Sequence, residues 1–375
     1  MKKVVLIVLN DFTNDSRVLK EALSLSKNYN VKVVALHNDG LKLKEQIGNV
    51  EVERVSLKTR FWPKQKIFQL FKYFEFIYKV VKGFKSYDIL HCNDLNTLPI
   101  GVLVKVLFNK EVKIVYDAHE WEINQKPNQS KISVKLNYIV EKLLIRYADE
   151  VLTVSKRIAQ EYTYTYNIDE PKLVLNCPGY KTVEKKNIFR KKFNISSEKK
   201  VFLYQGGLSY GRGIELIIEA FVNITESDNV IVFMGYGPLE NYINKYVNKY
   251  NNIFLHHAVE PQELLEYTSS ADFGISFIEG SCLSYEYCLP NKMFEYLMAE
   301  IPVIVSNLPE MKEFIKKYKV GTVADANDVG SLVKSINEIL LYDDFELKKN
   351  ILNVKKQYNW EKQEEVLLST YEGMS

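Results

Sequence analysis

Short apolar runs rich in β-branched residues alternate with longer helical patterns along the whole 375-residue chain. Apolar strands that are separated by helices form a parallel sheet whose two faces are both covered. In the first half we expect strands at 4–9, 31–36, 50–54, 89–91, 113–116 and 151–154, with helices at 17–25 and 133–147 among others. In the second half we expect strands at 201–205, 230–234, 253–255, 273–277, 302–306 and 321–323.

The alternation stops near Asn176-Cys-Pro-Gly179 and resumes after a polar, lysine-rich stretch. The length suits two domains. We therefore predict an α/β protein with two doubly wound, Rossmann-like parallel-sheet domains. The predicted bounds are 1–180 and 199–358, with a linker at 181–198 and a C-terminal helix at 359–375 that could pack back on the first domain. Ligands of such sheets bind beyond the carboxyl ends of the strands, so the expected site is a cleft between the domains.

Composition narrows the class of protein. The net charge of +3 gives no global reason to expect a nucleic-acid partner. The cysteines are scattered without a Cys-x-x-Cys pair, so neither a disulfide framework nor a thiolate zinc site is expected: Cys92, Cys177, Cys282 and Cys288. The apolar start reads as a buried strand rather than a secretion signal, and no run approaches the ~18–20 apolar residues of a membrane span. We expect a cytoplasmic protein, soluble or peripheral.

A glycine-rich segment, Tyr204-Gln-Gly-Gly-Leu-Ser-Tyr-Gly-Arg-Gly213, lies between an expected strand and an expected helix at 214–224. Glycines such as Gly206 and Gly207 allow a ligand to approach the backbone, and a helix N-terminus favours anions. Arg212 adds a bidentate partner for phosphate. A plain turn is the alternative interpretation.

A second segment predicts the start of a helix that is followed by a strand. Its sequence is Leu289-Pro-Asn-Lys-Met-Phe-Glu-Tyr-Leu-Met298. Pro290 blocks helix continuation upstream, and Asn291 is expected as the N-cap. Lys292 could bind an anionic group, and the Glu295 carboxylate, one turn later, could accept both hydroxyls of a ribose. The alternative is a capped helix with a solvated charge pair.

Histidines lie at the carboxyl ends of two expected strands of the first domain. His119 lies in Val115-Tyr-Asp-Ala-His-Glu120, and His91 lies in Ile89-Leu-His-Cys-Asn-Asp94. A lone histidine is usually structural. Two polar strand ends on one side of a parallel sheet nevertheless favour a site there, with His119 facing the cleft.

Together these segments resemble the retaining glycosyltransferases of the GT-B fold, family 4. The resemblance covers nearly the whole chain and also includes 15–22, 148–155, Gly235-Tyr-Gly-Pro238 and Asn359-Trp360. It implies that Glu295 holds the donor ribose, that Arg212 binds the donor diphosphate, and that His119 lies close to the transferred sugar. His119, Arg212 and Lys292 are then the expected catalytic residues. Gly206, Gly207, Gly235 and Asn291 join Arg212, Lys292 and Glu295 as the expected donor-binding residues.

The chain departs from the family pattern at three places. The first glutamate of the family's Glu-x7-Glu pattern is replaced by Tyr287, so Glu286 or Glu279 could take over its contact with the sugar. Gly207 stands where the family often has an arginine, and Lys292 could supply the missing charge. The glycine-rich loop after the first strand is replaced by Asn10-Asp-Phe-Thr-Asn-Asp15.

The expected reaction is sugar transfer from a UDP- or GDP-sugar to a saccharide or lipid-linked acceptor in envelope, capsule or glycan assembly. Because the sequence has no Asp-x-Asp at a strand end and no cluster with metal-ligand spacing, we predict a metal-independent reaction without a cofactor. Arg212, Lys292 and helix N-termini would stabilise the diphosphate leaving group. By the resemblance, the acceptor attacks from the leaving-group face and the anomeric configuration is retained. A nucleotide-sugar epimerase and a non-catalytic GT-B partner subunit are the alternatives.

The segment 58–85 carries eight basic residues against one acid, Glu75, and nine interleaved aromatic residues. On a helical wheel the expected core stripe is Ile67, Leu70, Phe71, Phe74, Tyr78 and Val81. A basic face with exposed aromatics suits an anionic membrane surface, here the inner face of the cell membrane. A core helix with a solvated lysine face is the alternative. No recognition module for nucleic acid accompanies the segment.

Overall fold

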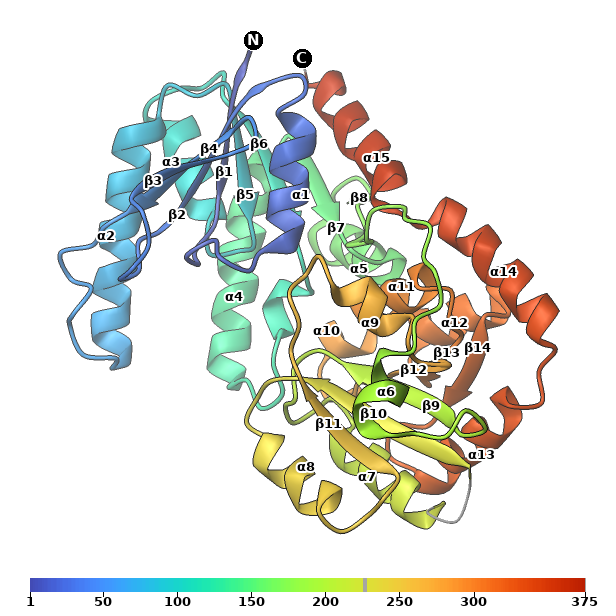
Figure 1. Cartoon of the computed structure of the whole chain (residues 1–375). Helices are drawn as coiled ribbons and strands as arrows, with labels where there is room; N and C mark the ends of the chain where they lie inside the picture. The colour runs from blue at the N-terminus through green and yellow to red at the C-terminus, as the bar shows by residue number, and fades with distance from the viewer. Residues whose placement is uncertain (225–227, 375) are drawn as a thin grey trace. The chain divides into compact units, whose positions relative to one another are not determined.

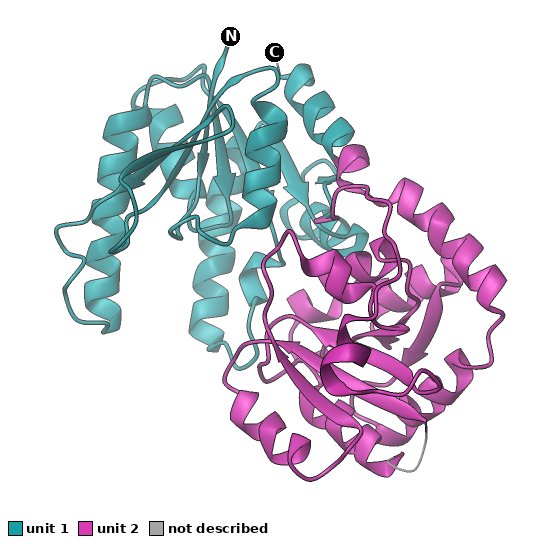
Figure 2. Cartoon of the chain, viewed as in Figure 1, with its two compact units in different colours: residues 1–175, 364–375 teal, residues 176–363 magenta. Residues whose placement is uncertain are grey.

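A computed structural model of the protein describes residues 1–224 and 228–374. The chain divides into two compact units (Figure 2). Unit 1 comprises residues 1–175 and 364–375, and unit 2 comprises residues 176–363.

Unit 1 is built on an eight-stranded sheet in the order β3-β4-β2-β1-β5-β6-β7-β8 (Figure 1). All its neighbouring strands are parallel except the β3–β4 pair. Its strands are β1 (Lys3–Ile7), β2 (Asn30–Leu36), β3 (Lys44–Ile47), β4 (Val50–Val55), β5 (Ile89–Asn93), β6 (Lys113–Ala118), β7 (Glu150–Thr153) and β8 (Lys172–Leu173). Its helices are α1 (Ser16–Leu25), α2 (Lys66–Phe84), α3 (Leu98–Leu107), η1 (Glu122–Asn124), α4 (Lys131–Leu144), η2 (Ile145–Tyr147) and α5 (Lys156–Tyr166).

Unit 2 is built on a six-stranded, all-parallel sheet in the order β11-β10-β9-β12-β13-β14. Its strands are β9 (Lys200–Gln205), β10 (Asn229–Gly235), β11 (Ile253–His257), β12 (Phe273–Ser276), β13 (Val303–Ser306) and β14 (Gly321–Ala324). Its helices are α6 (Ile188–Phe193), α7 (Ile214–Asn223), α8 (Glu240–Val247), α9 (Leu264–Thr268), α10 (Leu283–Glu286), α11 (Asn291–Met298), α12 (Pro309–Tyr318), α13 (Val329–Ile339) and α14 (Asp344–Gln357). Helix α15 (Trp360–Gly373) begins in unit 2 and continues into unit 1.

The twelve expected strands are all present, with ends shifted by three residues or fewer. Two strands were not expected, β3 and β8. The β3 segment Lys-Glu-Gln-Ile is polar because it pairs at the edge of the sheet, so it lacks the apolar signal of a buried strand. The two-residue β8 is too short to leave a pattern.

The division between the units falls at Leu175–Asn176 rather than after residue 180. The stretch interpreted as a linker contains α6, where the buried Phe189 ring contacts the rings of His256 and Tyr267. Arg190 of α6 forms an ion pair with Asp272 at 2.6 Å. These contacts place most of the lysine-rich stretch within unit 2.

The predicted core stripe of α2 is wrong. Within the stripe, Ile67, Leu70, Phe71, Phe74 and Tyr78 are exposed, and only Val81 is buried. The packed residues all lie in the second half of the helix: Phe76, Ile77, Val80, Val81 and Phe84. Because α2 is apolar on more than one side, periodicity alone does not identify the side that faces the sheet.

Across residues 1–224 and 228–374, none of the helices combines the length and the apolar character that a bilayer span requires.

Candidate functional site

The strand order of unit 2 reverses between β9 and β12, which are direct neighbours. Beyond the carboxyl ends of such a pair, the two following segments diverge to opposite faces of the sheet and leave room for a ligand. The segment after β9 is the glycine-rich 206–213, and the segment after β12 leads through α10 to α11. The topology therefore brings the two segments that the sequence singled out to one edge of the same sheet.

Glycines allow the loop after β9 to pack against the loop after β10. A Cβ on Gly235 would lie 1.9 Å from the carbonyl oxygen of Gly206, and a Cβ on Gly237 would lie 2.4 Å from that of Leu208. Gly206 has φ +111°, which a side chain rarely permits, and the space where its Cβ would lie is open. The loop therefore offers unobstructed backbone beside the end of β9.

Two cations lie at this edge, each over an aromatic ring. The Lys292 ammonium is 3.9 Å from the centroid of the Tyr204 ring, and the Arg212 guanidinium is 4.8 Å from that of Tyr285. Burial and then the positive charge of Arg212 lower the pKa of Lys292 to about 7. A dianionic group bound here would relieve this repulsion, so the pair has the electrostatics of a diphosphate site.

The carboxylate of Glu295 is positioned by the last residue of β9. Gln205 Nε2 donates to Glu295 Oε2 at 2.6 Å, and Gln205 Oε1 accepts from the Thr268 hydroxyl at 2.8 Å. Next to Glu295 on α11, the buried Tyr296 hydroxyl accepts from the Gln205 backbone N–H at 2.9 Å. These bonds fix α11, and with it Glu295, against the end of β9.

Asn291 is not the N-cap of α11, contrary to the sequence prediction. Pro290 has extended backbone and occupies the cap position, so Asn291 is the first helical residue. Proline has no side-chain oxygen, and no side chain of the described residues caps α11. The first-turn N–H groups of α11 therefore lie near Lys292 without a side-chain cap.

The candidates for the missing first glutamate lie between β12 and α11. Glu286 ends α10 and Tyr287 follows it, and both side chains are partly exposed. The Glu279 backbone N–H donates to the Gly211 carbonyl at 3.0 Å, which ties this segment to the glycine-rich loop.

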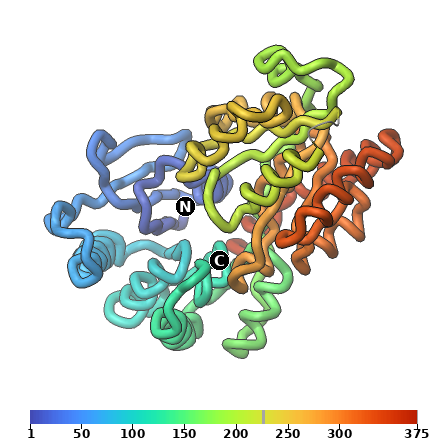
Figure 3. The backbone as a smooth tube through the Cα atoms, turned by 90° about the horizontal axis from the view of Figure 1, so that it is seen from below, coloured from blue at the N-terminus to red at the C-terminus, as the bar shows by residue number. Residues whose placement is uncertain are grey.

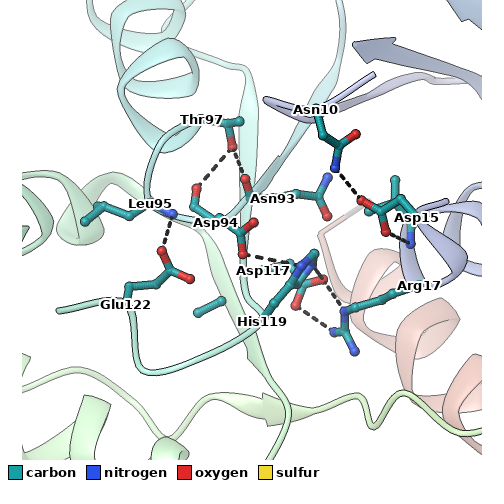
Figure 4. Close-up of polar contacts among 12 residues, drawn as sticks. Asn10, Asp15, Arg17, Asn93, Asp94, Leu95, Thr97, Asp117, His119 and Glu122 are labelled. Carbon is teal, nitrogen blue, oxygen red and sulfur yellow. Dashed lines mark hydrogen bonds and ion pairs between the residues drawn. The ribbon is translucent and has the colours of Figure 1, made fainter. Parts of the chain in front are cut away.

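In unit 1, His119 directly follows β6 and lies between two carboxylates (Figure 4). Its Nε2 is 3.0 Å from Asp117 Oδ2, and its Nδ1 is 3.3 Å from Asp94 Oδ1. Burial disfavours the charged ring, but Asp94 and Asp117 outweigh burial and raise the pKa of His119 to about 10. His119 is therefore an imidazolium at neutral pH. Asp94 adopts φ +62°, uncommon for a residue with a side chain, as constrained sites often do.

Arg17 of α1 holds Asp117 from the other side (Figure 4). Its Nε and Nη2 donate to the two Asp117 oxygens at 2.9 and 2.7 Å, and its Nη1 donates to the Val174 carbonyl at 2.6 Å. Arg17 and His119 together hold the pKa of Asp117 well below its usual range, although burial opposes this. Glu21 lies 3.1 Å from Arg17 Nε, and burial with the Asp117 charge raises its pKa well above the usual range. The fold therefore favours the protonated form of Glu21 more than water does.

His91 lies inside β5 and is fully buried, so its expected position at a strand end is wrong. The strand continues to Asn93 because its backbone pairs with β6 as far as the Asn93–Asp117 position. His91 Nδ1 is 2.6 Å from the Tyr371 hydroxyl of α15, and Nε2 is 3.6 Å from Asp117 Oδ2. Burial lowers the pKa of His91. The ring is therefore a neutral support that connects α15 to Asp117.

A cluster with metal-ligand geometry exists in unit 1, although the sequence showed no such spacing. Glu21, Asp117 and His119 each offer an atom within 4.8 Å of the others. They come from α1 and from the end of β6, so no local motif reveals them. Arg17 occupies both Asp117 oxygens, and the raised pKa of His119 favours its charged form. This set does not fit a divalent cation, which needs free anionic or neutral donors.

Comparison with known proteins identifies the family. A model of "Glycosyltransferase Family 4" matches residues 17–183, and a model of "Glycosyl transferases group 1" matches residues 185–358. The chain belongs to the family 4, group 1 glycosyltransferases. This glycosyltransferase is 24% identical over 309 residues to an uncharacterized glycosyltransferase of Methanocaldococcus jannaschii, covering 75% of this chain and 74% of that protein.

Solved structures support the GT-B fold of this glycosyltransferase. Sucrose-phosphate synthase from Thermosynechococcus elongatus superposes with a TM-score of 0.80 at 18% identity, over 100% of this chain and 99% of that chain. HepE of Anabaena, in complex with UDP-glucose, gives a TM-score of 0.75 at 13% identity over 100% of both chains. A trehalose-6-phosphate structure from E. coli, bound with UDP-2-fluoro glucose, gives 0.75 at 10% identity over 98% of both.

Sequence reasoning missed the residues that hold the functional side chains of the glycosyltransferase. Gln205 ends β9, Asp94 directly follows β5, and Asp117 is the second-last residue of β6, so a polar residue at or near a strand end was their available signal. Arg17 and Glu21 have helical i, i+4 spacing, which usually indicates a solvated pair. Nothing in the sequence shows that this pair is buried.

Proposed function

We propose that this glycosyltransferase transfers a sugar from a UDP- or GDP-sugar to a saccharide or lipid-linked acceptor in envelope, capsule or glycan assembly, with retention and without a metal ion. The observation that carries the proposal is the pair of cations, Arg212 and Lys292, beside the Gln205-anchored Glu295 at the switch point of unit 2. A UDP-sugar complex of the structurally similar HepE supports a nucleotide-sugar donor.

The leaving group of such a transfer is a nucleoside diphosphate. Arg212 presents planar donors to its oxygens, Lys292 supplies a point charge, and the first-turn N–H groups of α11 add partial positive charge. These groups are fixed before the reaction, so they stabilise charge as it develops without reorganisation. Glu295 accepts hydrogen bonds from the ribose hydroxyls.

Retention follows if the acceptor hydroxyl attacks from the face that the diphosphate leaves. The bond between the anomeric carbon and the phosphate oxygen breaks, the bond to the acceptor oxygen forms, and the acceptor proton passes to the departing phosphate. No separate carboxylate base is then required. His119, as an imidazolium, contributes a positive donor group to the transferred sugar.

A donor-hydrolysis screen tests the proposal. Common UDP- and GDP-sugars are incubated with the chain in the presence of EDTA, and the released nucleotide is measured. We expect hydrolysis of one donor, and we expect Glu295→Ala to raise its KM by about 10- to 100-fold, because hydrogen bonds to a charged group contribute about 1.5–3 kcal/mol. Glu346→Ala, which replaces an exposed glutamate of the same unit, is the matched control.

Each outcome of the screen supports or contradicts a specific part of the proposal. Unchanged activity in both Glu295→Ala and Arg212→Ala refutes the site assignment. Isomerised sugar nucleotide without acceptor supports the epimerase, and the absence of sugar-nucleotide binding in calorimetry supports a non-catalytic partner subunit. Activity that EDTA abolishes and a divalent cation restores contradicts metal independence.

Nucleotide binding is expected to take up a proton, because the pKa of Lys292 is about 7 in the free protein. Bound diphosphate favours the ammonium and raises this pKa. At pH 8 the free amine is largely neutral, so binding of UDP or GDP should take up between half and one proton. Affinity should accordingly fall as pH rises above about 7. Calorimetry in buffers of different ionisation enthalpy measures the uptake.

The control for proton uptake is a lysine in a similar but exposed setting. Lys249 lies 5.2 Å from the Tyr250 ring centroid in the same unit and is exposed. Lys292→Met should abolish the uptake, whereas Lys249→Met should leave it unchanged. Equal uptake by wild type and Lys292→Met would show that another group titrates.

A further inference from the structure

Two helices of unit 1 expose apolar stripes to solvent. On α2 the stripe is Ile67, Leu70, Phe71, Phe74 and Tyr78, and on α4 it is Ile132, Leu136, Ile139, Val140 and Leu143. Their exposed fractions range from 38% for Val140 to 74% for Ile132. Both stripes follow helical spacing, so each forms a continuous ridge. Immediately before α2, Phe61 and Trp62 are exposed as well.

The two stripes belong to helices on one face of the sheet. The connections β4–α2–β5, β5–α3–β6 and β6–α4–β7 all progress in the same direction along the strand order, and such crossovers are right-handed. Helix α3 contacts both α2 and α4 (Figure 3). Its C-terminal end adds exposed Leu103, Val106 and Leu107. We call the exposed residues of α2, α3 and α4, with Phe61 and Trp62, the docking face.

The charge on these helices is positive. Exposed cations on or beside the two stripes are Lys64, Lys66, Lys82, Lys131, Lys135, Lys142 and Arg146. The acid of α2, Glu75, accepts from the backbone N–H groups of Lys58 and Thr59 and pairs with Lys79. The acid of α4, Glu141, is buried and accepts from three tyrosine hydroxyls. Both helices therefore present lysines and apolar side chains outward while their carboxylates are engaged elsewhere.

We propose that the docking face binds the surface of an anionic lipid bilayer. Apolar ridges bordered by cations match the two layers of a membrane interface, since the ridges reach the acyl boundary and the lysines remain among phosphate groups. Each cation near an anionic surface strengthens the binding. A second copy of the chain fits less well, because a two-fold contact would place the same cationic surface against itself.

The inference deepens the proposed function and rests on it. A glycosyltransferase held at a bilayer through unit 1, with its donor bound by unit 2, would act on a lipid-linked acceptor rather than on a free saccharide. The bilayer contact itself requires no donor, so it can be tested without any transfer assay.

Vesicle flotation of the full chain tests the docking face. We expect binding to vesicles of 30% phosphatidylglycerol in phosphatidylcholine, weak binding to phosphatidylcholine alone, and release at 0.5 M salt. Of the three tryptophans, Trp121 and Trp360 are buried whereas Trp62 is 44% exposed. A blue shift of fluorescence on binding, quenched by brominated lipid and absent in Trp62→Phe, would place this residue in the interface.

Two pairs of variants separate the apolar and the cationic contributions. Phe71→Ser with Phe74→Ser, and Lys66→Glu with Lys131→Glu, should each lower the vesicle partition coefficient by at least about tenfold. The controls are Phe345→Ser and Lys349→Glu, which change an exposed phenylalanine and an exposed lysine of α14 in unit 2. Circular dichroism and UDP binding should be unchanged in all of them, because none belongs to the donor site.

Three results would overturn the inference. The first is no binding to anionic vesicles, and the second is binding that the two pairs of variants leave unchanged. The third is a concentration-dependent dimer in sedimentation velocity that the variants abolish, which would assign the face to a second copy of the chain. Wild-type donor hydrolysis without vesicle binding overturns the inference alone, whereas vesicle binding without donor binding or hydrolysis overturns the proposed function alone.

Discussion

Arg212→Ala is expected to lower the turnover number for donor hydrolysis by about 10²- to 10³-fold, the range measured when one preorganised oxyanion donor is removed. Arg212 lies just before α7, with its guanidinium 4.8 Å from the centroid of the Tyr285 ring of α10, and it can bind a diphosphate through two donors. Arg212→Lys restores the charge but not the planar pair of donors, so it should recover only part of the rate. Steady-state kinetics with the donor found in the screen provides the measurement.

The two cations are coupled, and this coupling gives the sharper test. Arg212 lowers the pKa of Lys292, so Arg212→Ala should raise that pKa. A larger fraction of Lys292 would then be protonated, which replaces part of the positive charge lost with Arg212. Each single variant is then partly compensated by the remaining cation. The double variant Arg212→Ala with Lys292→Met should lose more than the sum of the two single losses in activation free energy.

Proton uptake distinguishes this coupling from general damage. In Arg212→Ala, Lys292 is more fully protonated at pH 8 before UDP binds, so the uptake should decrease. Arg146→Ala is the matched control, since its guanidinium also lies over a tyrosine ring, 5.3 Å from that of Tyr147 in unit 1. Strictly additive losses together with unchanged uptake would refute the assignment of both cations to one diphosphate site.

Sequence patterns were sufficient for the strands of both sheets because buried parallel strands are continuous apolar runs. They were insufficient at the polar edge strand β3 and on α2, where apolar residues surround the helix and the buried side is decided by tertiary packing. The prediction of Asn291 as an N-cap failed for a local reason: Pro290 is extended and takes the cap position itself.

The site was predictable where its residues are near one another in sequence. Lys292 and Glu295 lie three residues apart on α11, and Arg212 belongs to a recognisable glycine-rich segment. Gln205 and Glu295 are ninety residues apart, and Arg17 and Asp117 are one hundred apart. Pairings at such distances depend on strand order, which determines the strand ends that become neighbours. The residues that position each candidate side chain could therefore be identified only from the folded structure.

Asp117→Asn is expected to destabilise unit 1 by about 3–5 kcal/mol, since breaking a buried ion pair leaves the partner charge uncompensated. Arg17 is 4% exposed and both of its bonds to Asp117 are charge-assisted. Urea denaturation followed by hydrogen-exchange mass spectrometry measures unit 1 separately from unit 2. The control is Asp39→Asn, which breaks an exposed aspartate–arginine pair with Arg60 and should cost about 1 kcal/mol or less.

Asp117 and His119 each make folding stability depend on pH, and in opposite directions. The pKa of Asp117 is depressed in the fold, so its stabilisation is present above the unfolded pKa of about 4 and is lost as pH falls through the folded value. The difference between wild type and Asp117→Asn should therefore narrow below about pH 4. The pKa of His119 is raised to about 10, so its stabilisation is complete below about pH 6.5 and is lost as pH rises toward 10.

Glu21 is expected to reduce the stability that is lost in Asp117→Asn. The Asp117 charge is one cause of the raised pKa of Glu21, so Asp117→Asn should lower that pKa and favour the Glu21 carboxylate, 3.1 Å from Arg17, as the partner of the guanidinium. Glu21→Gln alone leaves both Arg17–Asp117 bonds in place and should cost less than Asp117→Asn. In Glu21→Gln with Asp117→Asn neither carboxylate remains for Arg17, so the combined loss should exceed the sum of the single losses. An additive result would show that Glu21 does not exchange roles with Asp117, and a loss below about 1 kcal/mol for Asp117→Asn would contradict the buried ion pair itself.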